Sequence, residues 1–204
     1  MPAKTLALLR TDHKNMARVL AVLEHQIRDA QSDRPIALPL IKMIFTYFRE
    51  YPRKVHHPKE DLIYSALALR APADVANSAF HALADHRDLF DRMDPLDQAV
   101  RFLDDDPPSA LEIFGYQARQ FIEQQRRHMM LEETQLFPRA AELLTEADWS
   151  VIDRYLADDH DLAFGLEPSG PYEKLRGAIM DLDQILDALP PPDEAGRLLF
   201  GEPT

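Results

Sequence analysis

Four long stretches of the chain carry apolar residues at helical spacing. In the first, from about Ala3 to Ala30, apolar side chains recur three or four positions apart, which places them along one face of an α-helix. The same pattern runs through about 38–69, from just after Pro72 to about Leu103, and from Ser109, a candidate N-cap, to about Leu144. Strand-like alternation is absent, so the pattern predicts an all-α fold.

Short breaks that contain proline separate these stretches. They lie at residues 33–35, 71–72 and 104–108. Short connections make consecutive helices antiparallel neighbours, so we expect an up-down four-helix bundle over residues 1–144. Pro52 and Pro58 lie inside the second stretch and should kink or split that helix.

Residues 145–204 are predicted to form a short C-terminal helical extension with a tail. The sequence from Thr145 to Asp148 resembles a helix start, and that helix should end near His160. A loop with glycine and proline then leads to a helix from about Tyr172 to Leu189, before a proline-rich tail.

The composition limits which atoms can bind a metal and which partners are expected. The chain has 204 residues and no cysteine, so any metal must be bound by nitrogen and oxygen atoms. The net charge of −12 repels phosphate backbones and anionic lipids, which argues against nucleic acid and membrane partners. No apolar run reaches the roughly 20 residues of a membrane span, and no secretory signal is evident. We therefore expect a cytoplasmic protein.

Each of the four apolar stripes carries one histidine near its middle. In the second and fourth stripes a glutamate follows four positions later, and this spacing stacks both side chains on one helix face. A single histidine on an apolar face is more often a hydrogen-bonded core residue, but four in matched positions favour a metal site. The predicted ligands are His13, His56, Glu60, His86, His128 and Glu132.

Two ionised carboxylates in an apolar core need a counter-charge, since each unpaired ion costs several kcal/mol on an order-of-magnitude scale. The stripes themselves contain no Lys or Arg that would pair them. Two divalent ions fit this requirement: the glutamates bridge them together with an oxide or hydroxide, and each ion receives two imidazoles. Each ion is then about five-coordinate, with one position open for O2, NO or peroxide. Imidazole and carboxylate ligands suit iron, manganese or zinc.

The order His, His-x-x-x-Glu, His, His-x-x-x-Glu resembles the hemerythrin-like family of HHE cation-binding domains. The segments HHPKED at 56–61, DHRDLF at 85–90 and HMMLEETQLFP at 128–138 are similar to family motifs, and DLAFG at 161–165 resembles a further one. The resemblance implies a cofactor of two iron ions, with manganese or zinc as possible substitutes.

The sequence departs from the oxygen-carrying hemerythrins, which place two histidines one turn apart on the third helix and an aspartate later in the fourth. Here Ala82 stands one turn before His86, and Phe90 one turn after it. One nitrogen ligand is therefore missing, and we expect binding of, or reaction with, O2, NO or peroxide rather than simple oxygen carriage. Whether this amounts to enzyme activity stays open.

Two further interpretations remain. An iron- or oxygen-responsive sensor would signal through its C-terminal helices, with 148–189 as the output surface. A plain helical bundle would use its histidines for structure alone.

Several other side chains have less clear roles. His57 with Asp61 has the same spacing as His56 with Glu60, but the helical phase favours His56 and puts His57 in a supporting or surface position. Glu24 and Glu133 are interpreted as solvated acids rather than supports of the ligands. The remaining histidines, His25, His81 and His160, are expected at the surface or at helix ends, and five methionines as core filler: Met16, Met43, Met93, Met129 and Met130.

Overall fold

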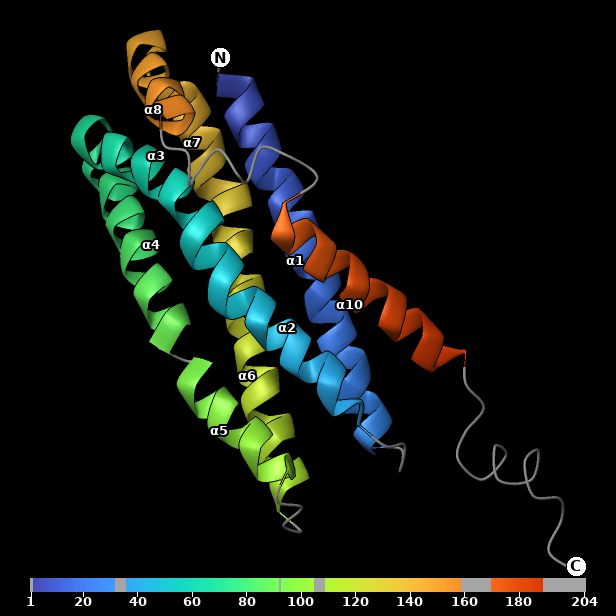
Figure 1. The fold of residues 1–204 in the computed structure, drawn as a ribbon. Coiled ribbons are helices and arrows are strands. Elements are labelled where there is room, and N and C mark those ends of the chain that lie inside the picture. The colour runs from blue at the N-terminus through green and yellow to red at the C-terminus, as the bar shows by residue number, and fades with distance from the viewer. Residues whose placement is uncertain (1, 32–35, 92, 105–108, 159–169, 189–204) are drawn as a thin grey trace, which may run out of the picture.

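The computed structural model describes residues 2–31, 36–91, 93–104, 109–158 and 170–188. Its helices form four long antiparallel segments (Figure 1). The first is α1 (Pro2–Gln31). The second comprises α2 (Leu38–Tyr51), a π-helical turn η1 (Pro52–His56) and α3 (His57–Arg70). The third comprises α4 (Ala73–Asp91) and α5 (Met93–Asp104), and the fourth α6 (Ala110–Leu131), the π-helical turn η2 (Glu132–Leu136) and α7 (Phe137–Leu143).

The four segments pack as a bundle. α1 contacts α2 and α6, α3 contacts α4 and α7, and α5 contacts α2 and α6. The described residues contain no strand. The predicted all-α helical bundle is therefore confirmed. Ser109 precedes α6 as expected, but its side chain makes no capping hydrogen bond.

The third segment differs from the single helix that its periodicity predicted. α4 ends at Asp91 and α5 begins at Met93. Pro95 lies in the first turn of α5, where its missing N–H costs nothing, whereas in an uninterrupted helix it would break a hydrogen bond and clash with the preceding turn. A new helix start therefore accommodates this proline.

Prolines also explain the two π-helical turns. The N–H of His57 bonds to the carbonyl of Pro52, and the N–H of Phe137 bonds to the carbonyl of Glu132. In each case the next residue is a proline, Pro58 or Pro138. A proline ring clashes with the carbonyl four residues earlier in a regular helix, and a wider turn relieves this clash. The second segment is thus interrupted near its prolines, as expected, by a turn that adds one residue to the helix.

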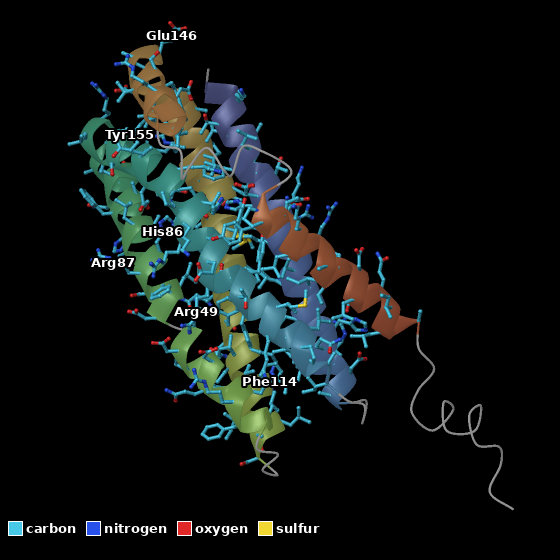
Figure 2. The ribbon with its side chains drawn as sticks, viewed as in Figure 1. Arg49, His86, Arg87, Phe114, Glu146 and Tyr155 are labelled. Atoms are coloured by element: carbon cyan, nitrogen blue, oxygen red, sulfur yellow. The ribbon has the colours of Figure 1, made fainter. Side chains whose placement is uncertain are left out.

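The apolar core of the described residues forms two clusters, and the predicted ligands lie between them. Figure 2 labels one of these ligands, His86 of α4, and one member of the first cluster, Phe114 of α6. One cluster contains Met16, Phe48 and Phe121, and the other contains Leu9 and Ile63 along with the start of α7. Each long segment passes from one cluster to the other near its histidine. The layer of polar side chains is therefore enclosed by apolar packing at both ends.

Within the described residues, two more helices pack on the bundle. α8 (Glu146–Asp158) begins with a reciprocal capping pair, since the N–H of Thr145 bonds to Asp148 and the N–H of Asp148 to the Thr145 hydroxyl. α10 (Pro171–Asp187) lies against α1 and α2 (Figure 1). The predicted helix starts near 145 and 172 are confirmed, whereas 159–169 and the tail lie outside the described residues. Within those residues, no helix has the length and apolarity needed to cross a bilayer.

Candidate metal centre

The structure brings all six predicted ligands into one cluster. Each of the four long segments contributes one histidine, and the second and fourth also contribute the glutamates. Glu60 and Glu132 have no exposed surface, and the four histidines are at most 8% exposed. Two buried carboxylates and four imidazoles therefore face one another inside the bundle.

The two oxygens of each glutamate face different pairs of histidines. Oε1 of Glu60 lies 3.4 Å from Nε2 of His13 and 3.2 Å from Nε2 of His56, and Oε2 of Glu132 lies 3.3 Å from Nε2 of His13. We call these atoms the His13 half of the centre.

The remaining oxygens face the other pair. Oε2 of Glu60 lies 3.5 Å from Nε2 of His86. Oε1 of Glu132 lies 3.5 Å from that same atom and 3.2 Å from Nε2 of His128. We call this the His86 half. Each carboxylate thus has one oxygen in each half, which is the arrangement that two bridging carboxylates require.

Buried polar atoms in the cluster lack partners. Among the described residues, hydrogen-bond partners are missing for Nε2 of all four histidines, both oxygens of Glu60 and Oε2 of Glu132. Unpartnered buried polar atoms are uncommon in native proteins, and each calls for an explanation such as an ion. These atoms are the ones that face into the cluster, so the donor set fits metal cations.

The buried carboxylates shift the pKa values of the histidines around them. Burial lowers the pKa of His13, but the carboxylates of Glu132 and Glu60 raise it, to about 10 overall. His86 behaves similarly: burial acts against Asp61 and Glu132, and its pKa rises to about 10. In the metal-free protein, imidazolium groups therefore supply the positive charge that the buried glutamates need.

No guanidinium group reaches the two glutamates in the described part of the chain. One lysine is buried beside the centre, contrary to the expectation that the core offers none: Lys59 is 2% exposed. Its Nζ lies 3.6 Å from Oδ2 of Asp12, so its charge is directed to that carboxylate rather than to Glu60 or Glu132.

Carboxylates also lie behind the histidine rings. Nδ1 of His13 is 3.0 Å from Glu133, Nδ1 of His56 is 3.3 Å from Asp12, and Nδ1 of His86 is 2.7 Å from Asp61. Such bonds fix the ring so that Nε2 points inward, and they increase the basicity of that nitrogen. The sequence interpretation of Glu133 as a solvated acid is therefore wrong, because its outward position on the helix still reaches the back of His13.

Tyr64 is a member of the centre that the sequence reasoning missed. Its hydroxyl donates a 2.7 Å hydrogen bond to Oε1 of Glu132 and has no access to solvent. The signal was available, since Tyr64 follows Glu60 by four positions on the same inner face.

His57 lies inside the bundle, so of the supporting and surface positions that were expected for it, the surface position is wrong. It is 8% exposed, and its ring stacks on that of His86 with centroids 3.9 Å apart. The expected phase assumed a regular helix, in which adjacent residues point about 100° apart. The π-helical turn that ends at His56 shifts this phase, so both His56 and His57 face inward.

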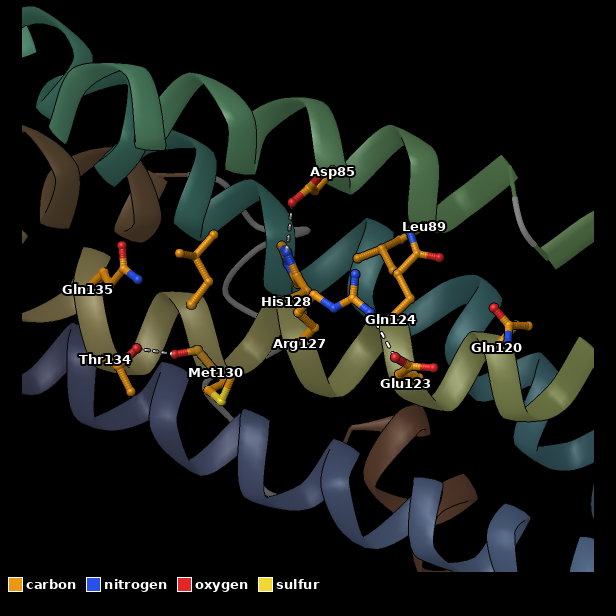
Figure 3. Close-up of a pocket in the computed structure, with 11 residues that line it drawn as sticks. Asp85, Leu89, Gln120, Glu123, Gln124, Arg127, His128, Met130, Thr134 and Gln135 are labelled. Carbon is orange, nitrogen blue, oxygen red and sulfur yellow. Dashed lines mark hydrogen bonds and ion pairs between the residues drawn. The ribbon is translucent and has the colours of Figure 1, made fainter. Parts of the chain in front are cut away.

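A surface pocket of about 520 Å³ opens between α4 and α6 beside the centre (Figure 3). Of the six predicted ligands, His128 lines it, and its Nδ1 lies 4.0 Å from Asp85. Met130 also lines this pocket and is 60% exposed, so its interpretation as core filler is wrong.

The remaining predictions, on the methionines, Glu24 and the other histidines, are only partly confirmed. Met16, Met93 and Met129 are buried as expected, and Met43 is half-buried. Glu24 bonds to Arg126 at the surface. His81 is exposed, whereas His25 is partly buried between α1 and α10, with Nδ1 3.0 Å from Asp183. His160 lies outside the described residues.

Comparison with known proteins supports the same interpretation. The family model of the hemerythrin HHE cation-binding domain matches residues 4–140. A search of curated proteins finds no match. The match covers most of the chain and all six residues of the cluster, and the buried histidines and glutamates fit a metal-binding protein. The chain belongs to the hemerythrin HHE cation-binding family.

Proposed function

We propose that this protein holds two iron ions and uses them to bind, or react with, a small ligand such as O2, NO or peroxide. The observation that carries the proposal is the division of the carboxylate oxygens between two pairs of histidines. Two carboxylates that each turn one oxygen to either side suit two ions better than one. Family likeness favours iron, with manganese and zinc as substitutes.

The chain's own groups have distinct tasks in this proposal. Glu60 and Glu132 bridge the two ions, and the four histidines each offer Nε2 to one of them. Asp12, Asp61 and Glu133 hold three of the rings in place through Nδ1. The apolar clusters on both sides exclude water and strengthen these electrostatic interactions. Iron, when bound, supplies redox chemistry and a free coordination position.

The test compares two histidines of the same helix. We expect anaerobically purified wild-type protein to carry about two irons per chain, and its oxidised form to show charge-transfer absorption that azide or peroxide changes. His86→Ala should lose iron, whereas the exposed His81→Ala should behave as wild type. Rapid peroxide turnover would identify an enzyme, and a stable adduct a binding protein. Wild-type protein that takes up no iron would refute the proposal.

A sensor is the second candidate, and a contact path to α10 favours it. His56 contacts Asp12 through Nδ1 at 3.3 Å. Burial raises the pKa of the Tyr51 phenol, and the carboxylate of Asp12 raises it further, so these two side chains lie close together. Tyr51 in turn packs edge-on against Tyr172 of α10, with ring centroids 5.7 Å apart. A change at the centre therefore has a short route to the C-terminal helix.

Limited proteolysis tests this route. If iron occupancy is coupled to the extension, removal of iron should speed cleavage within 148–189, and Tyr172→Ala should give fast cleavage with or without iron. Tyr155→Ala, an exposed tyrosine of α8, serves as the control and should keep the iron dependence. Equal cleavage of the iron-loaded and iron-free wild-type protein would rule out this second function.

A further inference from the structure

His57 occupies a position that packing alone explains poorly. It is the first residue of α3, directly after the π-helical turn, and it is buried beside the His86 half of the centre. Its ring contacts other imidazoles: it stacks on His86 and meets His128 edge-on, with centroids 5.9 Å apart. An apolar ring would fill this space without bringing polar nitrogens into the core.

The ligand atoms nearby suit one ion. One nitrogen of His57, one of His86, one of His128 and a carboxylate oxygen of Glu60 all lie within 4.8 Å of one another. Two ligands on opposite sides of an ion with bonds of about 2.1 Å are about 4.2 Å apart. For His57 to share this ion, its ring has to turn out of the parallel stack on His86, because the lone pair of each ring nitrogen lies in the ring plane and must point at the ion.

We infer that His57 is a fifth nitrogen ligand, which binds the ion of the His86 half together with His86 and His128. This inference rests on the proposed function, because it assumes two ions. The nitrogen ligand that the third helix lacks at Ala82 thereby comes from the second segment of the bundle. The ion of the His86 half has three imidazoles and two carboxylate oxygens, and the ion of the His13 half has only two imidazoles.

This asymmetry determines where a small ligand binds. Both ions share the two bridging carboxylates, so the ion with fewer histidines retains the free position. Azide or a similar anion therefore binds at the ion held by His13 and His56. The ion beside His57 has five protein ligands and is filled once the oxide or hydroxide bridge is added, so it serves mainly to hold the centre together.

The test uses His57→Phe, which keeps an aromatic ring against His86 but removes both nitrogens. With 57Fe(II), wild-type protein should bind two ions and give two Mössbauer doublets of equal area. In His57→Phe one ion should bind at least about tenfold more weakly in competition with a chelator. The doublet that azide shifts in the wild type should be the one that keeps its parameters in the variant. His81→Phe, at an exposed position of α4, is the matched control.

A second variant covers the case in which the bulkier ring is not tolerated. His57→Ala leaves space for free imidazole, which should restore the second iron, as followed by chelator competition and the second doublet. Circular dichroism checks that both variants fold. Two tightly bound irons with unchanged doublets in His57→Phe would overturn the inference while leaving the proposed function intact. So would iron affinity in His57→Ala that imidazole does not change. Wild-type protein without iron would instead refute the proposed function itself.

Discussion

The hydroxyl of Tyr64 donates a 2.7 Å hydrogen bond to Oε1 of Glu132, although the two residues lie on different helices and are 68 positions apart in the chain. Neither side chain has exposed surface. The bond joins α3 to η2 across the centre of the bundle, next to Nε2 of His86 and of His128. The tyrosine thus supports Glu132, one of the two carboxylates that are proposed to bridge the ions.

Tyr64→Phe removes this donor and leaves the ring in place. Hydrogen bonds to charged groups contribute about 1.5–3 kcal/mol, so we expect the metal-free variant to lose roughly this much unfolding free energy in urea. Tyr155→Phe, at an exposed position of α8, should unfold as wild type does. If Tyr64→Phe matched the wild type, the hydroxyl would be irrelevant to the stability of Glu132.

A substitution of Asp61 tests the role of the carboxylates that lie behind the histidine rings. Its Oδ1 lies 2.7 Å from Nδ1 of His86. Asp61→Asn retains the shape but removes the charge, and loss of such a partner typically lowers metal affinity about 10–100-fold. Chelator competition with Fe(II) measures this change. Asp88→Asn, an exposed aspartate of α4, should have no effect; equal affinities in the two variants would exclude this role.

The stability of the metal-free protein should depend on pH in a defined direction. The pKa values of His13 and His86 are raised to about 10 from 6.5, by nearby carboxylates that outweigh burial. Between these values the folded state binds more protons than the unfolded state. Stability should therefore fall as pH rises from about 6.5 to 10, by at most about 1.4 kcal/mol per pH unit for each group.

Acid should also destabilise the metal-free protein. The pKa of His57, lowered chiefly by burial, means that folding excludes a proton that the unfolded chain binds below pH 6.5. Burial and the nearby Glu60 raise the pKa of Glu132, but His128, His13 and His86 lower it, to about 2 overall. The stabilisation that this carboxylate contributes is therefore lost as the pH falls from about 4.5 to about 2. Urea unfolding after chelator treatment should thus give maximal stability near pH 6.5. Greater stability at pH 9.5 than at pH 6.5 would reverse this sign.

Periodicity predicted the bundle well because it reports which face of each helix is buried. Leu9, His13 and Met16 lie on one stripe of α1, and burial of that stripe is what the structure shows. The four histidines and two glutamates were found for the same reason. Their spacing along each helix and their similar depth in each stripe place them in one layer of the bundle.

Periodicity failed where the helix was irregular. The phase that favoured His56 over His57 assumed one unbroken helix, but the turn before Pro58 shifts every later residue. Pro95 likewise ended a stripe that looked continuous. Long side chains were a second source of error: Glu133 and Lys59 reach groups that their helical positions alone would not predict. These contacts depend on side-chain reach and on neighbouring helices.

Metal content tests the central claim most directly. Protein purified anaerobically should contain about two irons per chain. Glu60→Ala and Glu132→Ala should each lose at least one iron, because each substitution removes one oxygen ligand from each of the two ions. Glu123→Ala, an exposed glutamate of α6 with a side chain 63% accessible, should retain both. Full iron content in Glu60→Ala and in Glu132→Ala would contradict the assignment of these carboxylates as bridges.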